Sequence, residues 1–536
     1  MLQLTAQAAV AFAATRKIRA QAPAKRSSKH GAIIGEPVGA AHGEQVLADG
    51  GNVVDAIVTA ALVSAVVSLH NCGIGGYGGH MTLALDGGKQ VVSIDFNTTA
   101  PAAMTAETFV DSSGDARTDS HDHGWLAAGV PGTLAGLQLA LEKFGTRSFR
   151  EAISPALKLA RDGFAVSAQA AAIRGAARKL EKDPGSAKLY LPDGKPWKVG
   201  ATFRNPELAE MLEALAERNS VDSFYRGDIA QRIAEAFQKN GGLVTVADLA
   251  AYRARVVEPR KLSWGDFDIF TAPLTAGGLT VLEIASVLKA LDWEGLRDGH
   301  QKTHARVEAM RLAWRDRLQW LGDPEHVQVS VERLLSADYA RELAEKIRDA
   351  LKAKKPLELA TESRSHGGTV HLSCVDANGN MAALTLTHGN AFGACVTVPN
   401  LGLTLGHGMS RFEAKPGHPN SPAPGKRPLH NMCPTIVLRA GQPVLALGGA
   451  GGRRIPNSVF DVLFAFLTSR SLEEAIEFPR LQTEGNLEVI LEPRWPQTEV
   501  EHLRSIGFKT RSGAGARISA VAIDPATGES RAASRP

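Results

Sequence analysis

The chain contains 536 residues, of which 44% are hydrophobic and 22% are charged, and its formal net charge is +4. This is the balance of a globular protein with a sizeable core, and the length suggests several domains, although single domains of this size exist. The small net charge points neither to nucleic acid nor to an anionic membrane as a partner. The four cysteines form no CxxC pair, so the sequence indicates neither a zinc ribbon nor a disulfide framework, and individual disulfide bonds are not excluded.

Residues 1–32 are predicted to be a leader or a disordered N-terminal arm. The segment contains an apolar, alanine-rich run, and the tripeptide AQA at residues 20–22 is typical of a signal-peptidase site. Its positive charges, Arg16 and Lys17, follow the apolar part instead of preceding it, which is atypical of a signal peptide. A leader predicts a periplasmic or secreted protein, whereas an uncleaved arm leaves a cytoplasmic location open.

Helix and strand patterns alternate from about residue 35 to residue 166. The run AIVTAALVSAVVSL, residues 56–69, is shorter than the roughly 20 apolar residues that cross a bilayer, so we expect a buried helix and no membrane span. The segment MTLALDGGKQVVSIDF predicts two strands joined by a turn at residues 86–88.

The middle of the chain, residues 168–351, is predicted to be mostly helical, because apolar residues recur there at helical spacing. Residues 353–368 are polar and predict an exposed loop or linker. The strand-like runs TVHLSCVD, MAALTLTH and TIVLRAGQPVLALGG follow, and the helix-like run SVFDVLFAFLTS comes after them. Half-buried antiparallel strands together with segregated helices predict a layered α+β fold.

Two glycine-rich stretches could approach a ligand closely. GIGGYG, residues 73–78, matches GxGxxG literally, but a helix precedes it and a strand follows, which reverses the order of a dinucleotide-binding motif. We therefore expect a closely packed backbone beside a cavity there. LALGGAGGRRIPNSVFDVLF leads from a strand through residues 448–452 into a helix, so backbone N–H groups could hold an anion or a developing oxyanion. The alternative is a tight turn without a ligand.

Thr369 follows two glycines and opens the strand-like run TVHLSCVD. Cleavage of the bond between Gly368 and Thr369 would give Thr369 a free α-amine. The reference pKa of such an amine, about 7.7–8.0, allows it to accept the hydroxyl proton at neutral pH. The glycines would let the backbone enter a strained cleavage geometry without a side-chain clash. The same pattern also fits an ordinary strand preceded by a loose turn.

No metal site and no cofactor are predicted. His121 and His123 form one pair and His366 and His371 another, but neither pair has a third ligand, and no HExxH motif is present. We expect histidines of loops or of the core. No GxSxG motif occurs, so nothing supports a serine nucleophile.

Several stretches, taken in order, resemble the γ-glutamyltransferase family of N-terminal-nucleophile hydrolases. They include SLHNCGIGGYGGHM, AAGVPGTLAGLQLALEKFG, SPALKLARDGF, GGTVHLSCVDANGNMAALTLT, KRPLHNMCPTIV and GGAGGRRI. The resemblance covers nearly the whole chain from about residue 33. It implies a four-layer αββα sandwich and self-cleavage into a large subunit, residues 33–368, and a small subunit, residues 369–536, which stay together as a heterodimer. Pairing of two such heterodimers is left open.

By motif match, the resemblance places the cut between Gly368 and Thr369 and makes Thr369 the nucleophile. Thr387 stands where the family has a second threonine that hydrogen-bonds the nucleophile, and Gly451 and Gly452 match the oxyanion-hole glycines. An acyl-enzyme on Thr369 would then be attacked by water or by an amine acceptor.

The positions that bind the γ-glutamyl group in the family differ in this chain. Asn97, in DFNTTAP, stands where the family has an arginine for the α-carboxylate. Arg411, in GHGMSRF with Gly408, stands where the family has an acid for the α-ammonium. An arginine repels an ammonium in a confined pocket, and its planar guanidinium suits a carboxylate. We therefore expect a small-molecule amide substrate that carries an anionic group and lacks the glutamyl α-amine, of the oxamate or acylase type.

Further differences fall in the same expected pocket. His430 and Asn431 replace a family serine pair, and Gly389 aligns with a family asparagine, with Asn390 adjacent. Three alternatives stay open. The first is a conventional γ-glutamyl transferase or glutathione hydrolase in which Arg411 faces solvent. The second is an unprocessed, inactive member that acts as a binding protein, and the third, which we do not expect, is a nucleotide-binding oxidoreductase through GIGGYG.

Overall fold

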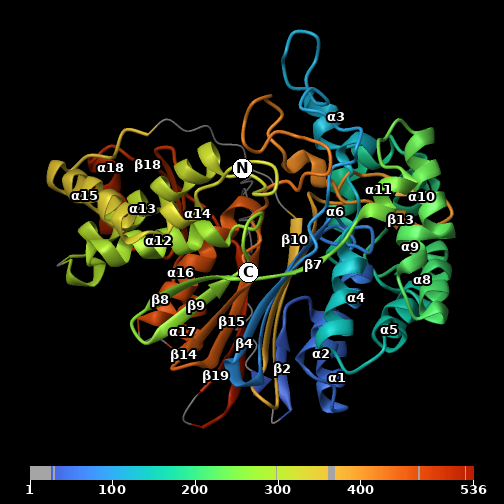
Figure 1. The fold of residues 1–536 in the computed structure, drawn as a ribbon, viewed down its shortest axis with the longest axis horizontal. Coiled ribbons are helices and arrows are strands. Elements are labelled where there is room, and N and C mark those ends of the chain that lie inside the picture. Colours follow the sequence, from blue (N-terminus) through green and yellow to red (C-terminus); the bar gives the residue numbers. More distant parts are fainter. Residues whose placement is uncertain are drawn as a thin grey trace, which may run out of the picture.

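Two β-sheets stack face to face, and helices cover the outer face of each sheet (Figure 1). The computed structural model describes residues 26–27, 30–296, 298–359, 368–468, 471–524 and 527–535. The layers follow one another as helices, sheet, sheet and helices, which confirms the predicted four-layer αββα sandwich of the α+β class.

The first sheet contains six strands in the order β2-β10-β11-β3-β4-β7, and every neighbouring pair is antiparallel. Its strands are β2 (Gly31–Ile34), β10 (Gly368–Asp376), β11 (Met381–Gly389), β3 (Gly78–Leu85), β4 (Gln90–Asp95) and β7 (Arg255–Val257). β10 and β11 are buried along their whole length, because helices cover one face of this sheet and the second sheet covers the other.

The second sheet contains seven strands in the order β1-β20-β19-β15-β14-β9-β8, and its neighbouring pairs are also antiparallel. Its strands are β1 (Arg26–Ser27), β20 (Ser530–Arg535), β19 (Arg517–Ile523), β15 (Gln442–Ala450), β14 (Thr435–Arg439), β9 (Phe267–Thr271) and β8 (Arg260–Trp264). Ala440 and Gly441 join β14 to β15 and both have positive φ, which matches the twist of a tight hairpin.

The contact between the two sheets fixes which strand ends lie together. Val375 of β10 packs in one buried cluster with Ala446 of β15. Further along, Gly448 of β15 lies against the His371 ring of β10, so closely that a Cβ on Gly448 would collide with the ring. The residue number falls along β10 while it rises along β15, so the start of β10 and the end of β15 lie at the same edge of the sandwich.

One helical layer covers the six-stranded sheet, with α1, α2 and α4 on the sheet and α5 and α8 behind them. The bounds are α1 (Pro37–Ala48), α2 (Val53–Val67), α4 (Thr133–Phe144), α5 (Phe149–Asp162) and α8 (Pro206–Arg218). All of α2 is buried, which explains why the predicted helix is apolar on every side. The same half of the molecule contains α3 (Thr118–Asp122), α6 (Gln169–Leu180), α7 (Pro184–Tyr190), α9 (Asp222–Arg226), α10 (Asp228–Lys239) and α11 (Val246–Ala251).

A second helical layer covers the seven-stranded sheet, with α12, α16 and α17 on the sheet and α13 and α15 packed against α12. The bounds are α12 (Gly278–Leu291), α13 (Gly299–Trp320), α14 (Val331–Leu334), α15 (Ala337–Ala353), α16 (Ile455–Leu467), α17 (Leu472–Glu477) and α18 (Gln497–Ser505). Three small sheets complete the fold: β5 (Phe164–Ala165) with β6 (Thr202–Phe203), β12 (Thr397–Val398) with β13 (Leu403–Thr404), and β16 (Leu481–Gln482), β17 (Glu488–Leu491) and β18 (Lys509–Ser512).

The N-terminal boundary differs from the prediction. β2 begins at Gly31, before the expected boundary at residue 33, because it pairs with the end of β10 at the edge of the sheet. Residues 1–25, which hold most of the predicted leader, lie outside the described residues, as do residues 360–367 of the predicted linker. Among the helices that the structure describes, none is long and apolar enough to cross a membrane.

The GIGGYG stretch joins α2 to β3, as the sequence predicts, and its backbone is closely packed. Gly78 has a φ of +120°, and a Cβ there would collide with the Phe96 carbonyl oxygen. A Cβ at Gly73 would collide with the His388 ring. The glycines are therefore explained by packing. All four cysteines are buried and free.

Candidate active site

Thr369 is the second residue of β10 and is held by a short network of hydroxyl and backbone groups, which we call the nucleophile edge: Gly368, Thr369, Thr387, Gly451 and Gly452. The Thr387 hydroxyl donates to the Gly368 carbonyl oxygen at 2.5 Å and accepts from the Gly389 N–H at 2.7 Å. Its oxygen also lies 3.2 Å from the Thr369 Oγ. Since the single Thr387 proton goes to Gly368, Thr369 is the donor in that contact. Thr387 therefore polarises the carbonyl that precedes Thr369 and orients its hydroxyl.

A bulge in the sheet explains how Thr369 reaches Thr387. Gly368 pairs with Gly389, but Val370 pairs with Leu386, so the register between β10 and β11 shifts at Thr369. The extra residue lies in β11, where Thr387 and His388 stand opposite Thr369 alone, and such a bulge bends its strand and redirects side chains. Gly389 has a φ of +99°, and a Cβ there would lie 2.5 Å from the His407 Nε2, so this position requires glycine.

Gly451 and Gly452 lie at the same edge, between β15 and the short turn η6 (Gly452–Arg454) that leads into α16. Their φ values are +151° and +64°, a conformation that side chains disfavour. Within the described part of the chain, neither N–H donates a hydrogen bond. Two free N–H groups at the start of a helix can stabilise a negative oxygen, which is what an oxyanion hole requires.

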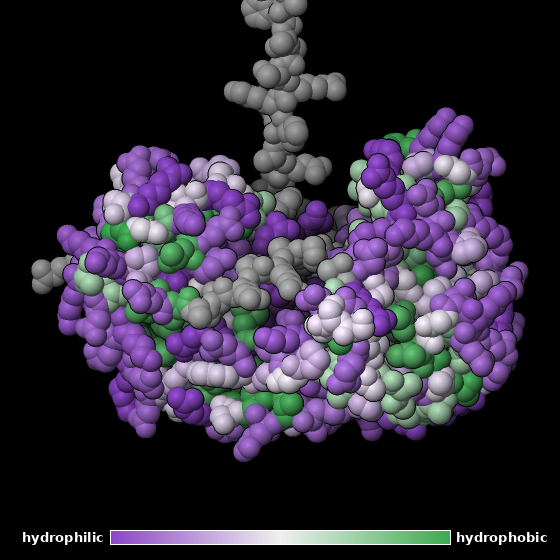
Figure 2. All heavy atoms as spheres, turned by 90° about the horizontal axis from the view of Figure 1, so that it is seen from above, coloured by the Kyte–Doolittle hydropathy of each residue, from purple (hydrophilic) through white to green (hydrophobic). Residues whose placement is uncertain are grey.

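A cavity of about 520 Å³, which we call the arginine cavity, adjoins this edge. It is lined by Asp119, His121, Asp122, Lys179, Trp314, Arg317, Leu318, Asn390, Ser410, Arg411, Phe412, Glu413, His418, Asn420, Leu429, Asn431 and Arg453. Arg453 directly follows the glycine pair, and the Asn390 backbone lies beside Gly368. The molecular surface is hollowed between the two helical halves and largely hydrophilic around the hollow (Figure 2).

The comparisons with known proteins agree with this geometry. Residues 39–536 match the family model described as gamma-glutamyltranspeptidase. The chain belongs to the γ-glutamyltranspeptidase family. It is therefore an amidohydrolase or transferase of this family, and several relatives in the family are named as proenzymes.

Relatives of two kinds match the chain. The glutathione hydrolase proenzyme of Escherichia coli (strain K12) is 36% identical over 461 residues, which cover 82% of this chain and 78% of the relative. The acylase ACY 1 proenzyme of Pseudomonas sp. (strain SE83) is 34% identical over 490 residues, covering 89% and 86%. The crystal structure of cephalosporin acylase from Bacillus halodurans superposes with a TM-score of 0.87 at 26% identity, covering 98% of each chain.

Arg411 ends the short turn η5 (Gly408–Arg411) and lines the arginine cavity. Its Nη2 donates to the His407 Nε2 at 2.5 Å and lies 3.4 Å from the Asn390 Oδ1. The His407 Nδ1 lies 3.0 Å from the Gly393 carbonyl oxygen, so Nδ1 carries the proton and Nε2 accepts. Burial, with a smaller contribution from Arg411, lowers the pKa of His407 well below its usual value. A neutral histidine therefore holds the Arg411 guanidinium.

Asp122, at the end of α3, is a carboxylate that lines the arginine cavity. It forms an ion pair with Lys179 and accepts from the Asn390 Nδ2 at 3.2 Å. Asp122 raises the pKa of Arg411 through its charge, although burial has the larger effect and lowers that pKa. Among the described residues, no carboxylate lies within 4 Å of the Arg411 guanidinium. Asp122 thus faces the cavity as part of a neutral pair with Lys179.

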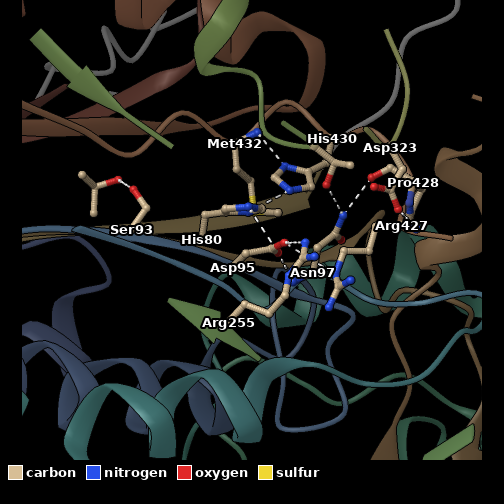
Figure 3. Close-up of polar contacts among 12 residues, drawn as sticks. His80, Ser93, Asp95, Asn97, Arg255, Asp323, Arg427, Pro428, His430 and Met432 are labelled. Carbon is tan, nitrogen blue, oxygen red and sulfur yellow. Dashed lines mark hydrogen bonds and ion pairs between the residues drawn. The ribbon is translucent and has the colours of Figure 1, made fainter. Parts of the chain in front are cut away.

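Two predicted pocket residues lie in a separate buried cluster (Figure 3). The Asn97 Nδ2 donates to the Thr275 Oγ1 at 2.7 Å and to the Pro428 carbonyl oxygen at 2.8 Å. His430 is 1% exposed, and its Nε2 lies 3.0 Å from the His80 Nδ1. Neither Asn97 nor His430 lines the arginine cavity. Asn97, a predicted pocket residue, thus bonds to the protein itself.

The His80 ring links His430 to Asp95 in that buried cluster. The His430 Nδ1 accepts from the Met432 N–H at 3.3 Å, so its Nε2 is protonated and donates to His80. The His80 Nε2 lies 3.3 Å from Asp95, whose other oxygen pairs with Arg255 at 2.5 Å. Burial lowers the pKa of His80 to about 4. Both histidines are therefore neutral and structural.

The remaining predicted positions divide between backbone and cavity. Gly408 is buried, and a Cβ there would collide with Thr98, so it contributes close packing. Gly389 contributes its N–H to Thr387. Asn390 and Asn431 line the arginine cavity together with Arg411. Within the described residues, no group of three or more His, Cys, Asp or Glu side chains could hold a metal ion.

Six charged residues of the cavity are absent from the sequence prediction: Asp119, Asp122, Lys179, Arg317, Glu413 and Arg453. Arg453 follows the glycine pair directly, and its place in that motif could have identified it. Arg317 lies in α13, a helix with buried charged residues on several sides, so helical periodicity gives no signal for the direction in which it points. Asp122 lies in a short helix between loops and likewise carries no sequence signal.

Proposed function

We propose that the chain cleaves itself between Gly368 and Thr369 and that Thr369 is then the nucleophile of an amidohydrolase. In the first step the Thr369 Oγ attacks the Gly368 carbonyl carbon, the peptide C–N bond breaks, and the acyl group moves from nitrogen to oxygen. Water then hydrolyses the ester, which releases the Gly368 carboxylate and leaves Thr369 with a free α-amine. The hydrogen bond from Thr387 to the Gly368 carbonyl oxygen at 2.5 Å carries this proposal.

The same groups suit the reaction on a substrate amide. The Thr369 α-amine accepts the proton of its own hydroxyl, and the Oγ attacks the substrate carbonyl carbon. The negative oxygen that forms is held by the N–H groups of Gly451 and Gly452. The C–N bond then breaks, the leaving amine takes the proton, and water or an amine acceptor resolves the acyl ester. The large and small fragments act together as a heterodimer.

The substrate that we propose is an amide with an anionic group and without the glutamyl α-amine. The observation that supports it is the Arg411 guanidinium, which lines the cavity with no described carboxylate within ion-pairing distance. A guanidinium pairs with planar anions through parallel hydrogen bonds, whereas an ammonium there would be repelled. The acylase relatives show that the family also contains members named for acylase activity.

A conventional γ-glutamyl specificity is the second candidate, because the glutathione hydrolase relatives match most of the chain and Asp122 lines the cavity. That reading requires Asp122 to leave Lys179 and bind a substrate ammonium. An unprocessed binding protein is the third candidate. A periplasmic or secreted location stays a prediction from the sequence.

The test has two parts on the purified protein. A denaturing gel should show two fragments, residues up to 368 and residues from 369, and a single persistent full-length band would favour the binding protein. The processed protein is then assayed with oxamate, other anionic amides, neutral amides and γ-glutamyl-p-nitroanilide. We expect kcat/KM for the best anionic amide to exceed that for the γ-glutamyl amide at least tenfold. Turnover of γ-glutamyl-p-nitroanilide at a rate comparable to that of conventional γ-glutamyl transferases would contradict the specificity proposal.

An Arg411→Met variant links the specificity to the residue. Loss of a charge-assisted hydrogen bond costs about 1.5–3 kcal/mol, so KM for an anionic amide should rise roughly tenfold or more. A neutral amide should be unaffected, which makes it the matched control. Equal changes for both amides would show that Arg411 supports the fold and not the substrate.

A further inference from the structure

A second guanidinium reaches the arginine cavity from the opposite side of the molecule. Arg317 lies on α13, in the helical layer of the seven-stranded sheet, whereas Asn390, beside Arg411, follows β11 of the six-stranded sheet (Figure 1). Arg317 is 3% exposed, and its guanidinium lies over the Trp314 ring at 5.9 Å. The two arginines thus face one cavity from different walls.

The partners of Arg317 are uncharged. Its Nη2 donates to the His430 carbonyl oxygen at 2.7 Å and to the Asn431 Oδ1 at 3.3 Å. Its Nη1 is buried and has no hydrogen-bond partner among the described residues. The Asn431 Oδ1 accepts from Arg317, so the Asn431 Nδ2 points away from Arg317. In the described part of the chain, this nitrogen donates no hydrogen bond. The Arg317 wall therefore offers a cation beside a free amide donor.

The other charged side chains of the cavity are paired or exposed, except for Glu413, which is half-buried. Arg453 forms an ion pair with Glu484 at 3.0 Å, and Lys179 pairs with Asp122. Asp119 is exposed. Among the described residues, no carboxylate lies within 4 Å of Arg317 or of Arg411. Two guanidinium groups are thus left without a counter-ion.

Burying two guanidinium groups without counter-ions costs free energy, and a bound anion can offset this cost. Burial, with a smaller contribution from the charge of Arg453, lowers the pKa of Arg317 to about 10. Arg411 shows the same direction for the same two reasons. A buried charge without a partner is unfavourable by several kcal/mol, and an anion that completes the pair removes this cost.

We propose that the arginine cavity binds substrates with two anionic groups, one at Arg411 and Asn390 and the other at Arg317 and Asn431. The proposal rests on the proposed function and narrows its substrate class from an anionic amide to a dianionic one. A cavity of about 520 Å³ lies in the range that encloses a small organic ligand. Each guanidinium would pair with one carboxylate through charge-assisted hydrogen bonds.

The test measures direct binding by calorimetry on the processed heterodimer, so it does not depend on finding the substrate. The probes are succinate, glutarate and adipate, each compared with the monocarboxylate of equal chain length: butyrate, pentanoate and hexanoate. We expect the best dicarboxylate to bind at least tenfold more tightly than its matched monocarboxylate. Equal affinities across all three pairs would overturn the proposal.

Variants assign the preference to the two walls. Arg317→Met and Arg411→Met should each abolish the preference for the dicarboxylate, whereas Arg341→Met, an exposed arginine on α15, should leave it unchanged. A preference that survives Arg317→Met would refute the second anion position. Because Arg317 also holds the segment that contains His430, self-cleavage on a gel serves as the folding check. If Arg317→Met is not processed, Asn431→Ala replaces it and should reduce the preference at least threefold, and an unchanged preference would refute the position.

The two proposals fail in different ways. If monoanionic and dianionic amides are hydrolysed equally well and dicarboxylates show no binding advantage, the dianionic class is wrong and the proposed amidohydrolase stands. If dicarboxylates bind selectively but γ-glutamyl amides are the preferred substrates, the anion positions stand and the proposed specificity is wrong.

Discussion

The nucleophile edge and the arginine cavity lie side by side but consist of different kinds of chemical group. The edge consists of two threonine hydroxyls and backbone groups, and among the described residues the hydrogen bonds of the Thr369 and Thr387 hydroxyls involve no charged side chain. The Arg454 Nε donates to the Gly451 carbonyl oxygen at 3.2 Å. The cavity wall is lined by charged side chains from α3, α13, η5 and η6. Groups placed by strand register resist change, because a shift would disturb the whole sheet. Side chains on turns can be exchanged singly, so one edge can serve cavities of different charge.

The largest expected effect concerns Thr369. Thr369→Ala removes the hydroxyl that attacks both the scissile peptide and the substrate, so self-cleavage should stop and activity should fall by roughly 10³-fold or more. Gel electrophoresis and an amide hydrolysis assay measure the two effects. Thr369→Ser keeps a hydroxyl and should still be processed. Two fragments from the alanine variant would show that another residue attacks Gly368.

A smaller effect is expected at Thr387. Thr387→Val removes the hydrogen bond to the Gly368 carbonyl oxygen, and loss of one such donor costs roughly 10²–10³-fold in rate. The half-time of self-cleavage, followed on a gel, should lengthen accordingly. Thr387→Ser restores the hydroxyl and should process at a rate near that of the parent chain. Normal processing of the valine variant would show that the Thr387 hydroxyl takes no part in self-cleavage.

A substitution at His407 should distinguish the arginine cavity from the nucleophile edge, because it should affect substrate binding and not the chemical step. His407→Leu removes the acceptor that holds the Arg411 Nη2. We expect KM for an anionic amide to rise roughly tenfold while kcat changes little, because binding is affected more than the chemical step. His407→Gln offers another acceptor and should recover part of the affinity. A fall in kcat with an unchanged KM would show that His407 acts on the edge instead of the wall.

The smallest effect concerns acid stability. Burial lowers the pKa of His371 and of His388 to about 3, below the unfolded value near 6.5. The unfolded chain therefore binds more protons as the pH falls below 6.5, so stability is lost in that direction. Between pH 6.5 and pH 5 each such histidine costs about 2 kcal/mol.

Thermal melting of the processed protein checks this sign. The Tm should be lower at pH 5 than at pH 7.5, and His371→Gln, which removes one titrating ring, should reduce the difference between the two. His371 bonds to Thr385 at 2.7 Å, so the variant is compared with itself at the two pH values and not with the parent chain. A Tm that is the same at both pH values would contradict the prediction.

The sequence predicts much of the fold and only part of the cavity. The buried helix α2, the β3–β4 hairpin and the strands β10, β11, β14 and β15 are confirmed, because each has a strong local pattern of apolar residues. Asn390, Arg411 and Asn431 line the cavity as expected, but Asn97 and His430 do not. The side chains of the neighbours His430 and Asn431 point in different directions, because His430 bonds to His80 and Asn431 bonds to Arg317. Such directions depend on contacts far away in sequence and leave no motif.

The strand order has a consequence for what self-cleavage would leave behind. In the six-stranded sheet β10 and β11, which follow the cut, lie between β2 on one side and β3 on the other, both of which precede it. The seven-stranded sheet is interleaved in the same way, because β14 pairs with β9 and β20 pairs with β1. The two fragments could part only by unzipping ladders in both sheets, which amounts to global unfolding. Cleavage would then produce a nicked protein and not two separable domains, and separated fragments would have to refold together.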